Sequence, residues 1–237
     1  MKQSSVVGLQ SSTLLCYITD RSQFPGDEDS RRSRLLANIV LAARCGVDYI
    51  QLRENDLSSR DLETLARAAM RQLRTENQKL RTGLLVNSRT DIALACGASG
   101  VHLRSDDISP SEVRKIWTQA AGGAPVTIGK SCHTRAEVSR AAQEGADFVV
   151  FGPVFEKDHG RPAGLEALHQ ACQEKIPVLA LGGVTLENAT PCMQAGAAGI
   201  AGIRLFQKNE MGGVVAGLRR LQMGNERQTS ANPKAEV

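Results

Sequence analysis

A short phrase recurs four times along the chain and limits the folds that this sequence can adopt. The copies read CGVDYI, CGASGV, EGADFV and AGAAGI, and each places a glycine just before a short apolar run. Glycine is the usual residue just past a helix end, and short uncharged apolar runs are typical of strands buried in a parallel sheet. The repeated order of helix, glycine and strand therefore predicts an α/β protein with parallel strands.

Eight apolar runs predict eight strands, and the 237 residues approach the roughly 250 of a (β/α)8 barrel. We predict a single (β/α)8 TIM barrel over residues 13–223, with an open doubly wound sheet as the alternative. The polar segment 1–12 is expected to be flexible, and the polar residues 224–237 to form a disordered tail. The predicted strands cover 14–19, 48–52, 83–86, 100–103, 126–129, 147–151, 178–181 and 199–203.

Helical spacing and capping signals fill the segments between these strands. The apolar spacing predicts helices at 31–44, 57–74, 91–96 and 165–172. Capping patterns predict two more, one beginning after Ser109 and one running from Thr134 to Glu144. A further helix is expected to open at residues 185–188.

Composition narrows the class of protein. Lys and Arg are scattered, the net charge is only +4 and aromatics make up 3%, so nucleic acid is not an expected partner. No run approaches the ~20 apolar residues that span a membrane. The six cysteines form no CxxC pair, so we expect reduced thiols in a cytoplasmic protein without a zinc site. The mild positive charge is compatible with phosphorylated small-molecule substrates.

Gly182 and Gly183 directly follow the predicted strand 178–181. Without Cβ atoms they let another molecule approach the backbone closely, although a tight turn from strand to helix is the alternative explanation. The N-terminus of the helix that follows would offer N–H groups to an anion. The next strand, 199–203, ends at the cation Arg204. Late strands with a helix N-terminus form the phosphate site of (β/α)8 barrels, so we expect a phosphate here.

Residues that follow the strands of such a barrel collect at one mouth, where the chemistry takes place. Polar residues and glycines follow most of the predicted strands, and polar groups are costly to bury without a purpose. The mouth is therefore expected to hold Gln51, Arg53, Asn87, Asp107, Ser131, His133, Gly182, Gly183 and Arg204.

Several of these side chains have both a functional and a structural interpretation. Arg53 suits a bidentate phosphate clamp, or an ion pair with Glu54. Asn87 can read a ring amine and a ring nitrogen, or bond its own backbone in a turn. Asp107 suits Mg²⁺, which favours one or two carboxylates plus substrate phosphate oxygens. His133 suits a proton shuttle near neutral pH, or it simply precedes a helix.

Three further polar residues receive a structural interpretation. Asp106 could share a metal with its neighbour, but facing solvent or supporting the turn at Ser109 explains it better. His102 and His169 are expected to be packing or surface residues.

The strand ends carry a set of motifs in a fixed order and spacing over about residues 14–222. The motifs read YITD, GVDYIQLREND, LLVNSRTDIALACGASGVHL, SDD, GKSCHT, GADFVVFGPVF, PVLALGGVTLEN and AGAAGIAGI. This set resembles the thiamine phosphate synthase family, which also includes thiazole tautomerases. The resemblance implies a (β/α)8 barrel that is often a homodimer. It also implies a Mg²⁺-assisted transferase that joins a pyrimidine diphosphate to a thiazole phosphate and releases pyrophosphate through a pyrimidine-stabilised carbocation.

The resemblance also assigns roles at the strand ends. Asp107 would bind Mg²⁺, and Ser131 would touch the pyrophosphate. Gly182 and Gly183 would seat the thiazole phosphate. The residues that would contact the pyrimidine diphosphate are Gln51, Arg53 and Asn87. The catalytic candidates are Arg53, Ser131 and His133, and the substrate-binding candidates are Gln51, Arg53, Asn87, Ser131, Gly152, Gly182, Gly183 and Arg204.

The chain departs from the family pattern at the diphosphate end. Asn55 stands where the family has Lys, and Ser88 replaces a second Mg²⁺ carboxylate. The loop 152–164 lacks the Thr-x-Thr-Lys stretch. At the thiazole phosphate, Arg204 replaces a late Ser. The cations that could supply the missing charge are Lys130, Lys157 and Arg161.

Three functions follow from this pattern. A thiamine phosphate synthase is favoured, because Asp107 and the Gln51, Arg53 and Asn87 set are present. A thiazole tautomerase would use His133 as a proton shuttle beside one phosphate site and would need no Mg²⁺. The third possibility is a non-catalytic barrel that binds thiazole phosphate or a partner protein.

Overall fold

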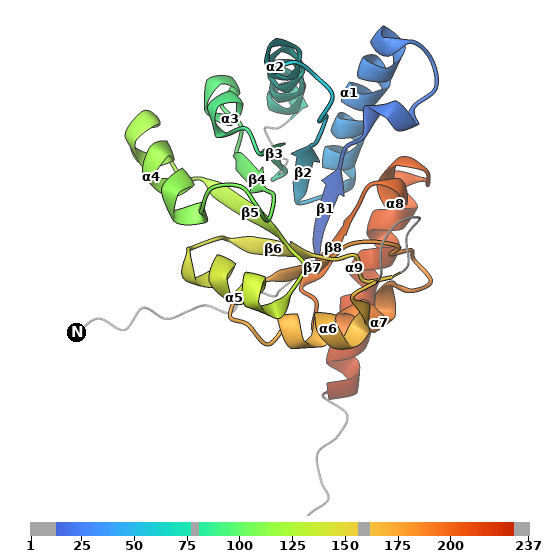
Figure 1. Cartoon of the computed structure of the whole chain (residues 1–237). Coiled ribbons are helices and arrows are strands. Elements are labelled where there is room, and N and C mark those ends of the chain that lie inside the picture. The colour runs from blue at the N-terminus through green and yellow to red at the C-terminus, as the bar shows by residue number, and fades with distance from the viewer. Residues whose placement is uncertain (1–12, 77–80, 156–161, 230–237) are drawn as a thin grey trace, which may run out of the picture.

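The computed structural model is a closed barrel of parallel strands with helices around it (Figure 1). It describes residues 13–76, 81–155 and 162–229. The strands pair in sequence order, and β8 closes the ring against β1, so the barrel prediction is confirmed and the open sheet is wrong. The strands are β1 Leu14–Ile18, β2 Tyr49–Leu52, β3 Gly83–Asn87, β4 Gly100–Leu103, β5 Thr127–Cys132, β6 Phe148–Phe151, β7 Val178–Ala180 and β8 Gly199–Gly202.

Helices connect successive strands around the outside of the barrel. Ser109 and Glu112 form the capping box of one of them, with Pro110 at its first position as the sequence predicts. No helix within the described ranges is both long and apolar enough to cross a membrane. The helices are η1 Arg21–Gln23, α1 Glu28–Cys45, α2 Ser59–Glu76, α3 Thr90–Cys96, α4 Pro110–Ala120, α5 Arg135–Gln143, α6 Gly164–Ala171, α7 Ala189–Gln194, α8 Arg204–Gln207 and α9 Met211–Thr229.

Apolar side chains form two layers, because successive residues of a strand point to opposite faces. The outer layer lies between the strands and the helices and includes Ile39, Leu65 and Ile128. Because the inner layer fills the centre of the barrel with apolar side chains, polar side chains that could act on a substrate lie at the barrel ends. The inner layer consists of Cys16, Ile18, Leu85, Phe148, Val150, Leu179 and Ala201.

Two of the recurring phrases place an aspartate at the same structural position. Asp48, just before β2, accepts the N–H of Leu15 on β1 at 2.7 Å through Oδ2. Asp147, just before β6, accepts the N–H of Ile128 on β5 at 2.7 Å in the same way. Each aspartate therefore connects the start of one strand to the strand before it. Both lie at the amino ends of the strands, which is the end of the barrel opposite the cavity.

Several element boundaries differ from the sequence-based expectation. β5 continues through Ser131 to Cys132, because both residues pair with β6, so Ser131 lies in a strand and not in a loop. Residues 224–229 belong to α9 and not to a tail, since helix elongation costs little once the first turns are packed. The expectations for 1–12 and 230–237 lie outside the described residues.

The helix expected to open at residues 185–188 begins later, at Ala189. The Asn188 side chain explains the delay. Its Oδ1 accepts the N–H of Thr185 at 2.7 Å, and its Nδ2 donates to the carbonyl of Gly183 at 2.9 Å. These bonds hold the segment as a turn, because side-chain bonds of this kind compete with helical ones.

Candidate active site

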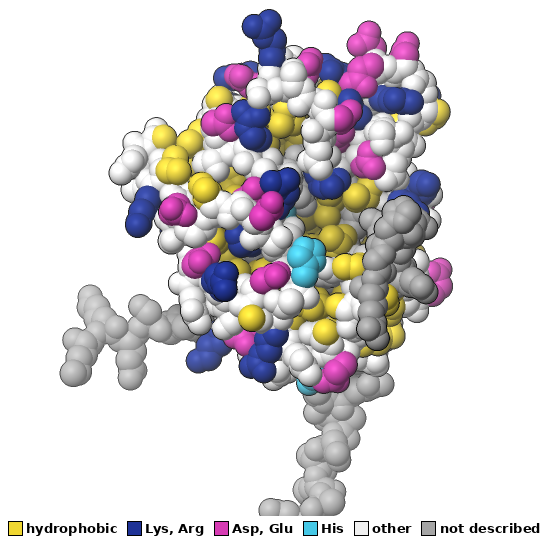
Figure 2. Space-filling model, viewed as in Figure 1, with side chains coloured by type: hydrophobic (Ala, Val, Ile, Leu, Met, Phe, Trp, Pro, Cys, Tyr) yellow, Lys and Arg dark blue, Asp and Glu magenta, His cyan; other side chains and the backbone are white. Residues whose placement is uncertain are grey.

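A cavity of about 1010 Å³ opens at the carboxyl ends of the strands. Figure 2 looks onto this face, where hydrophobic side chains form the floor of a hollow and Lys and Arg side chains lie near its rim. Residues at the ends of all eight strands line this cavity, so the structure brings together most of the residues predicted at the mouth. The predicted residues that line the cavity are Gln51, Arg53, Asn87, Ser131, His133, Gly182, Gly183 and Arg204.

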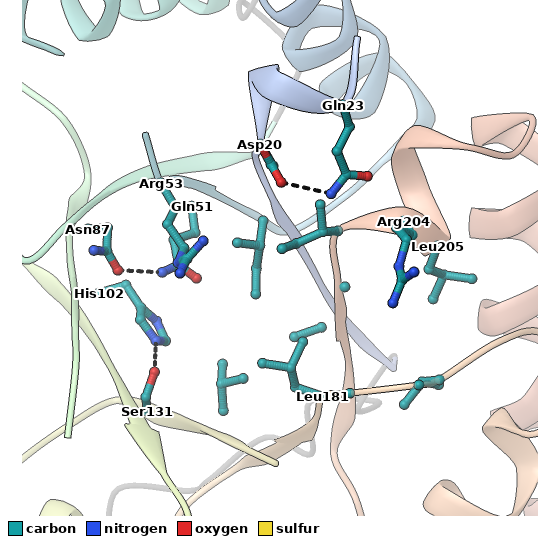
Figure 3. A pocket seen from close by; sticks show the side chains of 18 of the residues that line it. Asp20, Gln23, Gln51, Arg53, Asn87, His102, Ser131, Leu181, Arg204 and Leu205 are labelled. Carbon is teal, nitrogen blue, oxygen red and sulfur yellow. Dashed lines mark hydrogen bonds between the residues drawn. The ribbon is translucent and has the colours of Figure 1, made fainter. Parts of the chain in front are cut away.

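Gln51 and Asn87 form a buried amide pair at the ends of β2 and β3 (Figure 3). Gln51 Nε2 donates to Asn87 Oδ1 at 2.7 Å. Asn87 was alternatively expected to bond its own backbone, but its side chain bonds to the neighbouring strand. Gln51 Oε1 is buried and has no hydrogen-bond partner among the described residues. Because an unpaired buried acceptor is costly, this oxygen is placed to accept a hydrogen bond from a ligand.

Arg53 follows β2, and its exposed side chain lines the cavity. Its backbone N–H donates to Thr19 Oγ1 at 3.0 Å, and the Thr19 hydroxyl donates to Glu54 Oε1 at 2.6 Å. Glu54 is buried and pairs with Arg21 at 3.1 Å, although burial still raises the pKa of its carboxyl. Glu54 therefore pairs with Arg21 and not with Arg53, which was the alternative expected for Arg53. The Arg53 side chain faces the mouth of the barrel.

His102 is a site residue that the sequence analysis missed. It is buried, as one of the two expected placements requires. It also lines the cavity, and its Nε2 lies 3.0 Å from Ser131 Oγ, which was not expected. Burial lowers the pKa of His102 to about 4. Side chains alternate along β4, so the outward placement of Val101 and Leu103 turns His102 inward. This alternation in the sequence could have predicted that His102 lies inside the barrel. His169 is an exposed residue, as expected.

His133 contributes its ring to the cavity lining and so does more than precede α5. Its Nδ1 lies 2.6 Å from the carbonyl oxygen of Gly152. A carbonyl oxygen can only accept, so Nδ1 carries a proton in this arrangement. In the neutral ring, Nε2 is then an acceptor that can take up a proton.

Asp107 lies beside the cavity and not in its lining. Its Oδ2 accepts the hydroxyl of Ser88 at 2.6 Å and the N–H of Arg104 at 2.7 Å. Ser88 has a φ of 59°, an uncommon conformation for a residue with a side chain and one often found at functional sites. The neighbouring Asp106 is mostly exposed and lies 3.4 Å from Arg104, as a residue that faces solvent would. It also lines the cavity, which its structural interpretation did not predict.

The donor set beside Asp107 is small. Throughout the described residues, no three His, Cys, Asp or Glu side chains gather as a metal site. Mg²⁺ is nonetheless often held by one carboxylate together with substrate phosphate oxygens. Asp107 can supply that carboxylate, and the Ser88 hydroxyl adds a neutral oxygen beside it. The residues present therefore fit Mg²⁺ bound jointly with a phosphorylated substrate.

Packing within the chain explains the glycines at two of the predicted substrate-binding positions, Gly182 and Gly152. Gly182 has a φ of 95°, and a Cβ there would lie 2.5 Å from Pro153 Cα. A Cβ at Gly152 would lie 2.2 Å from a backbone carbonyl oxygen after β7. The chain itself thus approaches these two glycines. Gly182, Gly183 and Arg204 line the cavity, whereas Gly152 is not among its lining residues. Arg204 begins the short helix α8 that follows β8.

Of the three cations expected to supply extra charge, the structure describes only Lys130. Lys130 is buried, and its Nζ lies 3.4 Å from the backbone oxygen of Asp107, outside the cavity lining. Lys130 therefore supports the loop that carries Asp107. Lys157 and Arg161 lie outside the described residues. The cations in the lining are Arg53, Arg104, Arg204 and Lys208.

Comparison with known proteins gives this barrel a family. Residues 15–206 match the thiamine monophosphate synthase family. The chain belongs to this family. It is 41% identical over 192 residues to a protein of Geobacter sulfurreducens, covering 79% of this chain and 83% of the relative. It is also 37% identical over 204 residues to the thiamine-phosphate synthase of Chlorobium luteolum, covering 84% and 87%.

A solved structure agrees with the thiamine monophosphate synthase assignment. The thiamine phosphate pyrophosphorylase from Pyrococcus furiosus has a TM-score of 0.73 and 27% identity, covering 90% of this chain and 97% of that chain. The family match runs from β1 into α8, so it includes both the Gln51–Asn87 pair and the Gly183–Arg204 corner.

Proposed function

We propose that the chain is a thiamine-phosphate synthase, a transferase that joins hydroxymethylpyrimidine diphosphate to thiazole phosphate. Membership of the thiamine monophosphate synthase family supports this function. The observation that carries the site assignment is the buried, unpaired Gln51 Oε1 in the large cavity. It suits the amino group of a pyrimidine ring, which the amide of Asn87 helps to select.

The reaction then releases pyrophosphate. The bond between the pyrimidine methylene carbon and the diphosphate oxygen breaks, and its electron pair leaves with pyrophosphate. The thiazole nitrogen attacks the resulting carbocation. Arg53 and Ser131 line the cavity and stabilise the charge that develops on the leaving group. The apolar side chains of Ile18, Val150 and Leu181 exclude water that would otherwise capture the cation.

Asp107 is the residue that would hold Mg²⁺, together with oxygens of the diphosphate. When bound, the ion neutralises part of the charge on the leaving pyrophosphate. Lys130 supports this assignment indirectly, because its ammonium holds the backbone of the Asp107 loop.

The thiazole phosphate lies at the Gly183–Arg204 corner in this proposal. Arg204 supplies a full positive charge to the phosphate where the family pattern has a serine hydroxyl. A Cβ at Gly182 or Gly152 would clash with the chain itself, and Gly182 also lines the cavity beside Gly183.

A direct assay tests the proposed function. The chain is incubated with both substrates, with and without Mg²⁺, and thiamine phosphate and pyrophosphate are quantified. Mg²⁺-dependent formation of the two products in equal amounts supports the synthase. Absence of both products with the folded protein and intact substrates would overturn it.

One observation favours a second function. The His133 Nδ1 contact with Gly152 leaves an acceptor nitrogen in the ring that lines the cavity. A thiazole tautomerase would use that nitrogen to move a proton on thiazole phosphate alone. Isomerisation that requires no pyrimidine substrate or Mg²⁺ and is lost in His133→Ala supports the tautomerase. Binding of thiazole phosphate without either activity supports the non-catalytic barrel.

We also propose that the chain forms a homodimer in the cytoplasm. The family resemblance supports the dimer. The six cysteines are all free thiols, which supports a reducing compartment. Light scattering on the purified protein gives the oligomeric mass, and a monomer at assay concentration contradicts the dimer.

A further inference from the structure

His102 and Ser131 form a side-chain pair on the inner wall of the barrel. His102 lies on β4 and Ser131 on the adjacent strand β5, and both line the cavity (Figure 3). His102 Nε2 is 3.0 Å from Ser131 Oγ. The pair therefore joins the buried interior to the place where the substrate diphosphate is expected.

The wall around His102 is shaped to hold its ring in one place. Gly129 pairs with His102 across the strands, and a Cβ at Gly129 would lie 2.7 Å from His102 Nδ1 and 2.6 Å from Phe148 Cζ. The Phe148 ring lies 6.1 Å from the imidazole, tilted by 46°. Glycine at this position thus makes room for the ring, which is only 1% exposed.

The protonation state of His102 decides what Ser131 can do. Burial lowers the pKa of His102 to about 4, so the ring is neutral at pH 7 and carries one N–H. Nδ1 is buried and has no partner in the described part of the chain. A proton on Nδ1 would be an orphaned buried donor, which is rarer in proteins than an unpaired acceptor. The proton therefore belongs on Nε2, where it meets Ser131 Oγ.

We propose that His102 is a positioning residue that donates from Nε2 to Ser131 Oγ and thereby turns the serine hydrogen toward an anionic oxygen of the substrate diphosphate. The opposite tautomer would make Ser131 donate to the histidine and present only lone pairs to the anion. This inference rests on the proposed function for the identity of the anion.

A double-mutant cycle measures the coupling between the two residues. Ser131→Ala and His102→Phe are each expected to lower kcat/KM for the pyrimidine diphosphate by roughly 10- to 100-fold, as for a lost hydrogen bond to a charged group. The double variant is expected to lose no more than Ser131→Ala alone. His102→Gln keeps an N–H near the Nε2 position and is expected to recover part of the loss. KM for thiazole phosphate should stay within about twofold in all of them, since a bond confined to the diphosphate leaves the other substrate alone.

A second measurement does not need turnover. ¹⁵N NMR of histidine-labelled protein, with His102→Gln to assign the signal, is expected to show protonated Nε2 and bare Nδ1 between pH 6 and 8. Titration with inorganic pyrophosphate is expected to give weaker binding in Ser131→Ala and His102→Phe than in the unaltered chain. If the synthase assay fails while both results hold, the proposed function falls and the donor role toward pyrophosphate stands.

Either of two results overturns the role of His102. One is a ring protonated at Nδ1. The other is a double variant whose loss is the product of the two single losses, because independent losses mean that His102 does not act through Ser131. A His102→Phe variant that does not fold leaves the NMR result and His102→Gln to decide the question.

Discussion

The Ser88 hydroxyl donates to Asp107 Oδ2 at 2.6 Å, beside the mouth of the cavity. A carboxylate and a hydroxyl thus share the place where the family pattern has two carboxylates. Ser88 also holds a positive φ of 59°, a conformation that Asp and Asn adopt more readily than most residues. The position can therefore accept an aspartate without a change in the backbone.

We predict that Ser88→Asp lowers the Mg²⁺ concentration for half-maximal activity about tenfold, because a second carboxylate adds a ligand to the ion. Asp107→Asn should reduce Mg²⁺-dependent activity at least 100-fold, because it removes charge stabilisation from a preorganised site. Pyrophosphate release measured against Mg²⁺ concentration checks both. Asp29→Asn, on the exposed first turn of α1, is the matched control. Full Mg²⁺-dependent activity in Asp107→Asn would contradict the assignment of Asp107 to the ion, and an unchanged Mg²⁺ curve in Ser88→Asp would show that position 88 does not reach it.

Glu54 links the buried core to Arg53 through the Thr19 hydroxyl. Arg21 keeps its pairs with Asp56 and Glu28 in Glu54→Ala, but the Thr19 hydroxyl and the backbone N–H of Arg21 lose their acceptor. We therefore predict a loss of about 2 kcal/mol in the free energy of unfolding. KM for the pyrimidine diphosphate should rise about tenfold, because Arg53 is held less firmly. Urea unfolding and steady-state kinetics check the two effects. Glu63→Ala removes only a surface pair and is expected to cost less than about 1 kcal/mol.

His102 makes the stability of the chain depend on pH. Its pKa is about 4 in the folded chain, below its ordinary value of 6.5, so the unfolded chain binds more protons between these values. The free energy of unfolding should therefore fall as the pH is lowered from 6.5 to 4, by up to about 3 kcal/mol from this residue.

Urea unfolding at pH 7 and pH 4.5 measures this loss. His102→Gln is expected to lose less stability than the unaltered chain over the same interval, and His169→Gln, at the surface, to behave like the unaltered chain. Equal losses in all three proteins would contradict a buried neutral His102.

Asp48 and Asp147 are expected to be structural and not catalytic. Asp48 Oδ2 also contacts Arg219 at 2.8 Å, and Asp147 Oδ2 contacts Arg114 at 3.1 Å. Replacing either aspartate by alanine leaves a strand N–H unpaired, so each should cost about 1–3 kcal/mol in unfolding free energy. Values of kcat and KM should stay within about twofold, because both residues lie at the opposite end of the barrel. A large fall in kcat at unchanged stability would disprove this assignment.

The fold was readable from the sequence because each repeat couples a helix end to a buried strand. The same logic placed Gln51, Asn87 and Arg204 at one mouth, since strand ends converge in a closed barrel. It did not place Ser131 within β5, because a serine and a cysteine do not look like strand residues until β6 pairs with them.

Three-dimensional packing decided the remaining assignments. Gly182 lines the cavity as predicted, but the space that its missing Cβ leaves is taken by Pro153 and not by a ligand. Arg53 looked like a partner for Glu54, but Arg21, 33 residues away from Glu54 in the chain, takes that carboxylate. Such partners are distant in sequence, so local patterns carry no information about them.

A crystal structure with thiamine phosphate and pyrophosphate bound tests the central assignment most directly. We predict the pyrimidine amino group within hydrogen-bonding distance of Gln51 Oε1, pyrophosphate beside Arg53 and Ser131, and the thiazole phosphate at Gly183 and Arg204. Products bound elsewhere, or a pyrimidine that leaves Gln51 Oε1 without a partner, would contradict the account.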